Sequence, residues 1–247
     1  ETMDIHTASR NLLFPHHENE IAIAESLTGK PLANYWIHSE LLMVDGKMMS
    51  SENSNVISLQ DVIDKGFTAR ELRFLLFSVH YRKPINFTYK RLESVKTTLR
   101  RIDDFTCKLL CLLPGRPHPE VAAYVSNMEE KFFEAMDDDL NVSKGLSALT
   151  NFIKQMHPVL QVNNLDAEQK DYVLESLSKL NSVLQVMRLK GCPLGVEANR
   201  LIQIREEARV NKDWKAADDA RDELTKRGIT VIDTENGPVW KKSDEGL

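Results

Sequence analysis

Hydrophobic residues recur every three or four positions along most of this chain, which is the spacing of one face of an α-helix. The clearest series runs from Leu92 through Val95, Leu99 and Ile102 to Leu112. Similar series cover 121–136, 141–158 and 172–187. A Pro-Gly-Arg-Pro break at 114–117 separates the series that ends at Leu112 from the one that begins at 121. Four long amphipathic segments with short links predict an antiparallel helical bundle.

The residues before the bundle alternate between strand and helix patterns. The chain opens within a strand, and a short helix is predicted from near Pro15 to Gly29. Short strands at 35–38 and 41–44, a turn at 45–46 and a polar loop at 47–55 follow. Ser58 and Thr68 are predicted to cap the next two helices.

The end of the chain has a third pattern. A segment at 188–195 is the predicted linker, followed by helices at 196–211 and 214–227 and strands at 229–232 and 239–240. An α+β module of about fifty residues needs support from a neighbour. The predicted fold is therefore mainly α, with a small α/β region, an antiparallel bundle and a small C-terminal α+β module.

Composition narrows the classes of protein. The 247 residues carry 32 basic and 37 acidic side chains, which excludes a globally basic nucleic-acid binder but not a local basic face. No apolar run approaches the roughly 20 residues of a membrane span, and no secretory leader is visible. The chain does not begin with Met and opens inside a strand, so we expect the back part of a longer protein.

Cysteine is sparse. The three cysteines exclude a disulfide framework and favour a reduced, cytoplasmic compartment. Cys107 and Cys111 stand four residues apart on an apolar helix and are predicted to be buried structural thiols.

Two short segments carry candidate chemistry near the start. His16 and Glu20 lie four positions apart on a predicted helix, and imidazole nitrogen with carboxylate oxygen suits zinc. The alternative is a helix N-terminus whose acidic residues are favoured by the helix dipole. The loop Lys-Met-Met-Ser-Ser at 47–51 offers backbone N–H groups, hydroxyls and the Lys47 ammonium to phosphates, or is a solvated hairpin loop.

A third candidate is a basic and aromatic group near the end. Arg205, Arg209 and Lys212 fall on one side of a predicted helix and its turn, with Trp214 and Trp240 nearby. Guanidinium groups beside exposed aromatic rings suit unstacked RNA bases. The alternative is an ordinary charged surface helix, because acidic residues share the segment.

Five motifs along the chain point to one family. They are Asp-Ile-His at 4–6, Phe-Pro-His-His-Glu-Asn-Glu at 14–20, Tyr-Trp-Ile-His at 35–38, Met-Asp-Asp-Asp-Leu-Asn at 136–141 and Arg-Glu-Glu-Ala-Arg at 205–209. With these motifs, the chain resembles the cysteinyl-tRNA synthetases, which are class I aminoacyl-tRNA synthetases, from end to end.

The resemblance implies a domain order. It implies the second half of a Rossmann-like catalytic domain with the ATP loop at 1–57, stem-contact and connecting helices at 58–113, a helical tRNA-binding bundle at 114–190 and an anticodon-binding module at 196–247. The activity implied is ATP- and Mg²⁺-dependent activation of cysteine and its transfer to cysteine tRNA, by a cytoplasmic monomer.

The resemblance also assigns roles to residues near the start of the chain. His6 corresponds to a histidine near the adenylate, and His16 and Glu20 to zinc ligands whose two cysteine partners would lie upstream of residue 1. A zinc ion that binds a thiolate distinguishes cysteine from serine without editing.

Further roles fall on the loop and on the C-terminal module. The implied ATP loop consists of Lys47, Met48, Met49, Ser50 and Ser51. The implied catalytic residues are His6, Lys47, Ser50 and Ser51. The implied tRNA contacts are Arg205, Arg209, Lys212, Trp214, Arg221 and Trp240.

Three departures from the family pattern leave alternatives open. The first ATP motif of the family is absent, the two lysines of its Lys-Met-Ser-Lys-Ser loop fall on Met48 and Ser51, and Thr-Ala-Ser at 7–9 replaces a glycine-rich stretch. Only Lys47, one place early, offers a charge to pyrophosphate. One alternative is a degenerate paralogue that binds tRNA without charging it. Another is a ligase that joins cysteine to a small amine, which would not need the C-terminal module.

Overall fold

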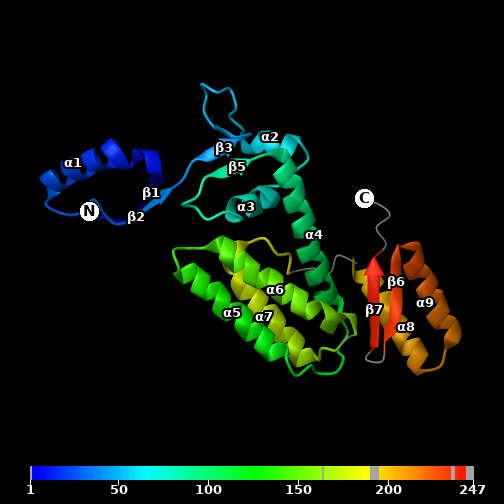
Figure 1. Cartoon of the computed structure of the whole chain (residues 1–247). Helices are drawn as coiled ribbons and strands as arrows, with labels where there is room; N and C mark the ends of the chain where they lie inside the picture. Colours follow the sequence, from blue (N-terminus) through cyan, green and yellow to red (C-terminus); the bar gives the residue numbers. More distant parts are fainter. Residues whose placement is uncertain (1, 163, 190–194, 235–236, 243–247) are drawn as a thin grey trace. The chain divides into compact units, whose positions relative to one another are not determined.

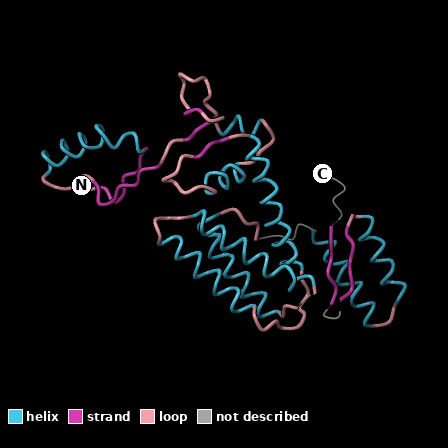
Figure 2. Tube along the Cα trace, viewed as in Figure 1, coloured by secondary structure: helices cyan, strands magenta, loops and turns pink. Residues whose placement is uncertain are grey.

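The computed structural model describes residues 2–162, 164–189, 195–234 and 237–242, which are mostly helical as predicted (Figures 1 and 2). The chain divides into two compact units, one of residues 1–97 with 135–144 and the other of 98–134 with 145–247. The four segments expected from the sequence are finer than this division and stay a prediction. None of the described helices is long and apolar enough to cross a bilayer.

The first unit contains short strands and short helices. Its elements are β1 (Met3–Ser9), the turns η1 (Arg10–Leu12) and η2 (Leu13–His17), α1 (Glu18–Thr28), β2 (Ala33–Ser39), β3 (Leu42–Val44), β4 (Lys47–Met48), α2 (Leu59–Asp64), α3 (Ala69–Phe77), β5 (Ile85–Phe87) and the start of α4 (Tyr89–Cys111).

β1 and β2 form a parallel pair connected through α1, with His6 opposite Trp36. Gly29 ends α1 at φ +65°, a left-handed conformation that glycine adopts without strain. No residue of α1 is buried, and Leu27 and Tyr35 are 81% and 70% exposed. Parallel sheets are normally covered on both faces, so this βαβ unit has apolar surface that a larger sheet would bury.

The region after β2 differs from the predicted one by two short strands. Lys47 and Met48, expected in a loop, form β4 and pair antiparallel with β3, and β5 pairs parallel with β3. Two- and three-residue strands have no periodic pattern, and long-range pairing alone defines them. Ser58 and Thr68 cap α2 and α3 as predicted, each within a complete capping box.

An acidic turn closes the first unit. The Asp139 carboxylate accepts hydrogen bonds from the Tyr81 hydroxyl and from the Arg82 guanidinium. These bonds lower the pKa of Asp139 and raise that of Tyr81, whose burial has the larger effect. The turn at 135–144 is therefore held to the segment before β5.

The second unit contains the predicted bundle. Its helices are the rest of α4, α5 (Val121–Asp137), α6 (Val142–Gln161) and α7 (Ala167–Leu184), followed by α8 (Gly195–Val210), α9 (Trp214–Lys226), β6 (Ile229–Thr234) and β7 (Gly237–Lys242). Phe132, Phe152, Met156 and Leu177 are at most 1% exposed, so the periodic apolar faces meet in one core.

The small C-terminal module packs on the end of α4. Ala198, Ile202, Leu224 and Ile229 share a buried cluster with the two cysteines of that helix. This contact confirms the expectation that the module needs a neighbour. β6 and β7 pair antiparallel, as the predicted hairpin requires.

Cys107 and Cys111 are both buried, as predicted. Cys111 takes part in a disulfide, which corrects its interpretation as a reduced thiol. The spacing of residues within α4 could not predict this bond, because a disulfide depends on a sulfur that is not part of the helical pattern. Cys192 lies outside the described residues.

Candidate functional site

Histidine rings gather between α1 and the β1–β2 pair. Alternate residues of a strand face the same side, so Trp36 and His38 of β2 lie beside His6 of the neighbouring β1. The His6 ring stacks on Trp36 with centroids 4.4 Å apart. His17, at the start of α1, faces the same place, and its Nδ1 lies 2.8 Å from Nε2 of His38.

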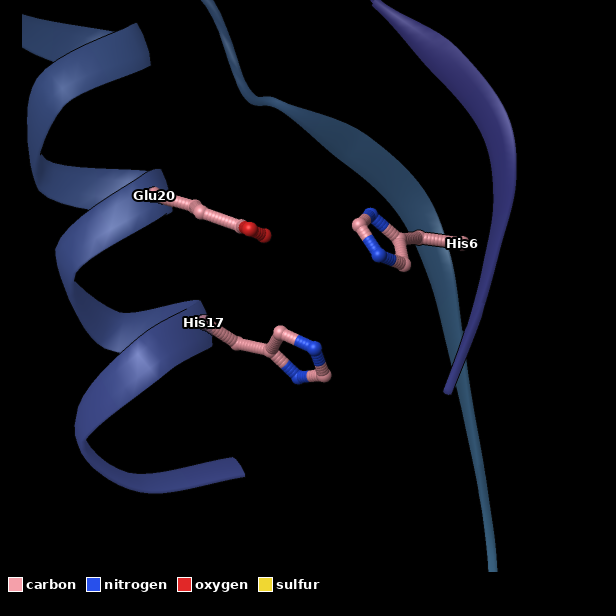
Figure 3. A group of neighbouring side chains, drawn as sticks. All are labelled: His6, His17 and Glu20. Carbon is pink, nitrogen blue, oxygen red and sulfur yellow. The ribbon is translucent and has the colours of Figure 1, made fainter. Parts of the chain in front are cut away.

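The cluster has the donor atoms of a metal site. His6, His17 and Glu20 point toward one another, and their ligand atoms all lie within 4.8 Å of one another (Figure 3). Nδ1 of His6 is buried and has no hydrogen-bond partner among the described residues. Two imidazoles and a carboxylate match the donor types of zinc, which takes four ligands in structural sites. The residues present fit such an ion if further ligands join them.

The charge state of the cluster follows from its packing. Burial lowers the pKa of His38, and His17, His6 and Arg82 lower it further because a positive charge there would be repelled. His38 is therefore neutral at pH 7, and one ring of the His17–His38 pair donates its hydrogen to the other.

The predicted ligands are only partly brought together. Glu20 belongs to the cluster, whereas His16 is exposed and does not, and its pairing with Glu20 stays a prediction. His17, Trp36 and His38 were not among the predicted site residues. Trp36 and His38 are two positions apart in β2, so their sequence spacing places them on one face of the strand. A local pattern does not show which strand lies beside β2, and so could not bring them next to His6.

A cavity of about 390 Å³ lies at the carboxyl ends of β1 and β2. Thr7 and Ala8 line it with Ser39 and with Tyr81. The carboxyl ends of parallel strands are the usual ligand-binding edge of an open α/β sheet. Thr7 and Ala8, which the resemblance aligns with a glycine-rich stretch, thus border a volume that a small ligand can enter.

The loop at 47–55 is closed by two asparagines. The side-chain amides of Asn53 and Asn55 donate to the Met48 carbonyl, at 2.9 and 3.1 Å. The side-chain oxygen Oδ1 of Asn55 accepts from the Ser50 backbone N–H at 2.9 Å. One backbone donor expected to face phosphate is thus engaged inside the loop.

Met49 of the expected ATP loop is engaged as well, so its role as a backbone donor to phosphate stays a prediction that this bond weighs against. Its backbone N–H donates to the Leu42 carbonyl at 3.0 Å, in line with the antiparallel pairing of β3 and β4, and the residue is half-buried. A backbone N–H used by strand pairing is not free for phosphate. Lys47 and Ser51 are exposed and remain candidates.

Arg205 differs most from its expected role. It is 3% exposed, and its guanidinium pairs with Asp233 at 2.9 Å and with Glu206 at 2.5 Å. Arg209 pairs with the same Asp233 at 2.7 Å. The ion pairs with Asp233 lie between α8 and β6, so Arg205 stabilises the module, and its contact with RNA stays a prediction that this burial weighs against.

Other predicted RNA contacts are accessible. Trp214 is 62% exposed at the start of α9, and Lys212 is exposed in the turn before it. The Arg221 side chain is 62% exposed and lies 3.9 Å from Asp218. Only the backbone of Trp240 belongs to the described structure. The turn between α8 and α9 therefore presents an aromatic ring beside cations.

Known protein families match the chain in succession. Residues 1–97 match the class I (C) tRNA synthetase catalytic domain, residues 131–188 the DALR domain, and residues 193–240 the cysteinyl-tRNA ligase anticodon-binding domain.

Curated relatives match nearly the whole chain. The cysteine–tRNA ligase of Chlamydia pneumoniae is 39% identical over 244 residues, which are 98% of this chain and 52% of that protein. The cysteine–tRNA ligase of Protochlamydia amoebophila is 35% identical over 98% of this chain and 51% of that protein. The chain therefore spans about half the length of the curated relatives it matches.

Solved structures show the same fold class, and the sequence matches give the family. A leucyl-tRNA synthetase of Agrobacterium radiobacter, solved with tRNA, has a TM-score of 0.57 at 16% identity over 77% of this chain and 28% of its own. Methionyl-tRNA synthetase of Mycobacterium tuberculosis has a TM-score of 0.53 at 14% identity over 74% and 38%. With three successive domain matches and relatives aligned over 98% of its residues, the chain belongs to the cysteinyl-tRNA synthetase family.

Proposed function

We propose that this chain is part of a cytoplasmic cysteine–tRNA ligase, carrying part of the catalytic domain and most of the tRNA-binding surface. The observation that carries the proposal is the succession of catalytic, DALR and anticodon-binding matches along one chain. The exposed apolar side chains of the βαβ unit support a catalytic domain completed by further strands. We expect no aminoacylation by this chain alone.

The first experiment measures binding of the chain to cysteine tRNA and to the same tRNA with an altered anticodon, at two salt concentrations. Salt-dependent binding that weakens when the anticodon changes supports recognition by the C-terminal module. Equal binding of both tRNAs contradicts it.

A variant locates the contact. Base stacking on an aromatic ring contributes about 1–3 kcal/mol, so Trp214→Ala should weaken binding roughly 5- to 150-fold. Tyr172→Ala, which truncates another exposed aromatic ring outside this module, is the matched control and should leave the preference for the unaltered anticodon unchanged. An equal loss in both variants would show that Trp214 does not stack on a base.

ATP and Mg²⁺ are proposed as substrate and ion of the complete enzyme. The side chains of Lys47, Ser50 and Ser51 would hold the phosphates, and His6 would lie near the adenylate. A bound zinc ion would supply a soft cation for the substrate thiolate, held by Glu20 with His16, as the resemblance implies.

The geometry offers a second histidine for the same ion. Glu20 lies with His6 and His17 in the structure, so zinc affinity of His16→Ala and His17→Ala, measured by chelator competition, separates the two arrangements. Loss in His16→Ala alone supports the family pair. Loss in His17→Ala alone supports the cluster.

A degenerate paralogue that binds tRNA without charging it is the second candidate. The observation in its favour is that Met48 and Ser51 stand where the family has lysines. Met48→Lys with Ser51→Lys, in a protein with a complete catalytic domain, should raise aminoacylation strongly if only the loop was lost. No gain would place the defect elsewhere, at Thr7 and Ala8 for example. The small-amine ligase is disfavoured by the match at 193–240.

A further inference from the structure

A groove lies between α4 and α6 within the second unit. Its cavity measures about 590 Å³, and its lining comes from residues 98–108 of α4 and 150–161 of α6. Each stretch covers about three helical turns, or roughly 15 Å. Two helices thus form the walls of an elongated groove.

The floor of the groove is apolar and belongs to the packed core. Ile102, Phe105 and Leu160 line it and are 4%, 3% and 2% exposed. Phe105 packs edge-on against Phe152, with ring centroids 6.0 Å apart. Because these side chains are fixed by the core beneath them, the groove cannot close by their collapse.

The walls of the groove carry cations. Arg101 and Lys108 of α4 and Lys154 of α6 line it, and within the described part of the chain none of the three forms an ion pair. Asp104 is the one carboxylate in the described lining. Arg101 and Lys108 are seven positions apart, which corresponds to about 10 Å along α4. The groove therefore has positive charge on both walls and little to neutralise it.

These features disfavour RNA and small anions. Bases bind single-strand platforms by stacking on accessible aromatic rings, and nucleic-acid interfaces are strongly polar. Here the described lining has one exposed aromatic ring, that of His157, and its one Phe is buried, so it lacks the row of accessible rings on which successive bases stack. A single anionic group, in turn, does not reach cations about 10 Å apart on one wall.

We propose that this groove binds an amphipathic α-helix of a partner protein, with apolar side chains on one face and carboxylates along its edges. A helix laid into a groove between two helices places apolar residues, three or four positions apart, on the floor. Two of its carboxylates then lie about two turns apart, beside Arg101 and Lys108 on one wall, and another lies beside Lys154 on the other wall.

The test uses a fluorescein-labelled 18-residue helical peptide with Leu on one face and Glu along both edges. Two further peptides carry Gln or Lys in place of every Glu. Binding to the full chain is measured by fluorescence anisotropy. We expect the Glu peptide to bind at least about tenfold more tightly than the Gln peptide, and the Lys peptide to bind more weakly still.

Two variants locate the peptide. Arg101→Glu with Lys154→Glu should weaken binding of the Glu peptide at least about tenfold. Arg100→Glu with Lys131→Glu is the matched control, because it makes the same charge change at exposed residues that do not line the groove. Thr150→Trp fills the groove without a change of charge and should weaken the binding of all three peptides.

The proposal is overturned if the Glu peptide does not bind up to about 1 mM, or if the control pair weakens it as much as the groove pair. It is also overturned if a single-stranded RNA oligonucleotide binds and loses affinity in Thr150→Trp while the Glu peptide does not. Circular dichroism of each variant confirms that the bundle remains folded. The preference for the unaltered anticodon is expected at α8 and α9, so it should survive these substitutions even if the reversed charges weaken tRNA binding overall, and the two proposals fail separately.

Discussion

Asp233→Asn is the substitution that tests whether Arg205 supports the C-terminal module or is held ready for RNA. Asn preserves the shape of the side chain and removes its charge. In the structure the Asp233 carboxylate accepts hydrogen bonds from the Arg205 guanidinium at 2.9 Å and from the Arg209 guanidinium at 2.7 Å. The Arg205 side chain is 4% exposed, so after the substitution a buried guanidinium retains Glu206 as its one charged partner among the described residues.

The magnitude follows from the two bonds and their exposure. A charge-assisted hydrogen bond contributes about 1.5–3 kcal/mol when protected from solvent. The Asp233 and Arg209 side chains are 46% and 38% exposed, so solvent screening reduces the second bond to about 0.5 kcal/mol. We therefore expect a loss of about 2 kcal/mol in the stability of the module, or about thirtyfold in its opening equilibrium.

Hydrogen exchange of backbone amides is the appropriate assay, because it reports each element separately. Protection in α8 and α9 should fall about thirtyfold while that in α5, α6 and α7 is unchanged. Glu223→Gln is the matched control. It removes a carboxylate that pairs with Arg227 at 3.2 Å along α9, where both side chains are about 40% exposed, and such a pair contributes about 0.3–0.5 kcal/mol.

Equal changes in protection for Asp233→Asn and Glu223→Gln would refute the structural role of Arg205. A uniform loss across both the module and the bundle would refute the assumption that the module opens by itself. If the role is confirmed, weak RNA binding by an Arg205 variant is no evidence of an RNA contact, because the variant also loosens the module.

Three further predictions concern stability. Arg205 lowers the pKa of Asp233, so the pair stabilises the module above the ordinary carboxyl pKa of about 3.9, and this contribution is lost as pH falls toward the lower folded value. The protection of α8 should therefore drop as pH falls below about 4, and less so in Asp233→Asn. Ser58→Ala removes the capping box of α2 and should cost about 1 kcal/mol, seen as faster exchange in α2 but not in α3, and equal rates in both would contradict it. Leu177→Ala leaves a cavity in the bundle and should cost about 2–5 kcal/mol in urea unfolding, whereas Val183→Ala, at a 44% exposed position of the same helix, should cost less than about 1 kcal/mol.

The long helices could be predicted from the sequence because each repeats one periodic pattern many times. α4 alone has six apolar positions of the series, from Leu92 to Leu109, so a single misleading residue does not alter the interpretation. The caps Ser58 and Thr68 were equally visible, since a capping box depends on residues three positions apart. β4 and β5 were missed because strands of two and three residues exist only through their pairing with β3.

The candidate sites were likewise predicted from the sequence only in part. Local spacing identified Glu20 and the segment around it, but not that His6 and His17 approach it from β1 and from the turn before α1. The expected ATP loop was visible as a string of residues, but the bond from Met49 to β3 was not. Family motifs, which are strings of adjacent residues, were enough to name the family. The position of a ring across a parallel strand pair depends on register, and register is set by the sheet as a whole.

The sequence by itself determined which residues share a face of each helix, and hence the mainly helical architecture and the family. Only the tertiary structure decided what covers each face. Arg205 and Arg209 follow one another along α8, yet β6 brings Asp233 to both and buries the first. Arg101 and Lys108 share a face of α4, and this face becomes one wall of a groove because α6 lies beside it. The physical reason is that helical periodicity is a local property of the backbone, whereas burial and pairing depend on residues distant in the chain.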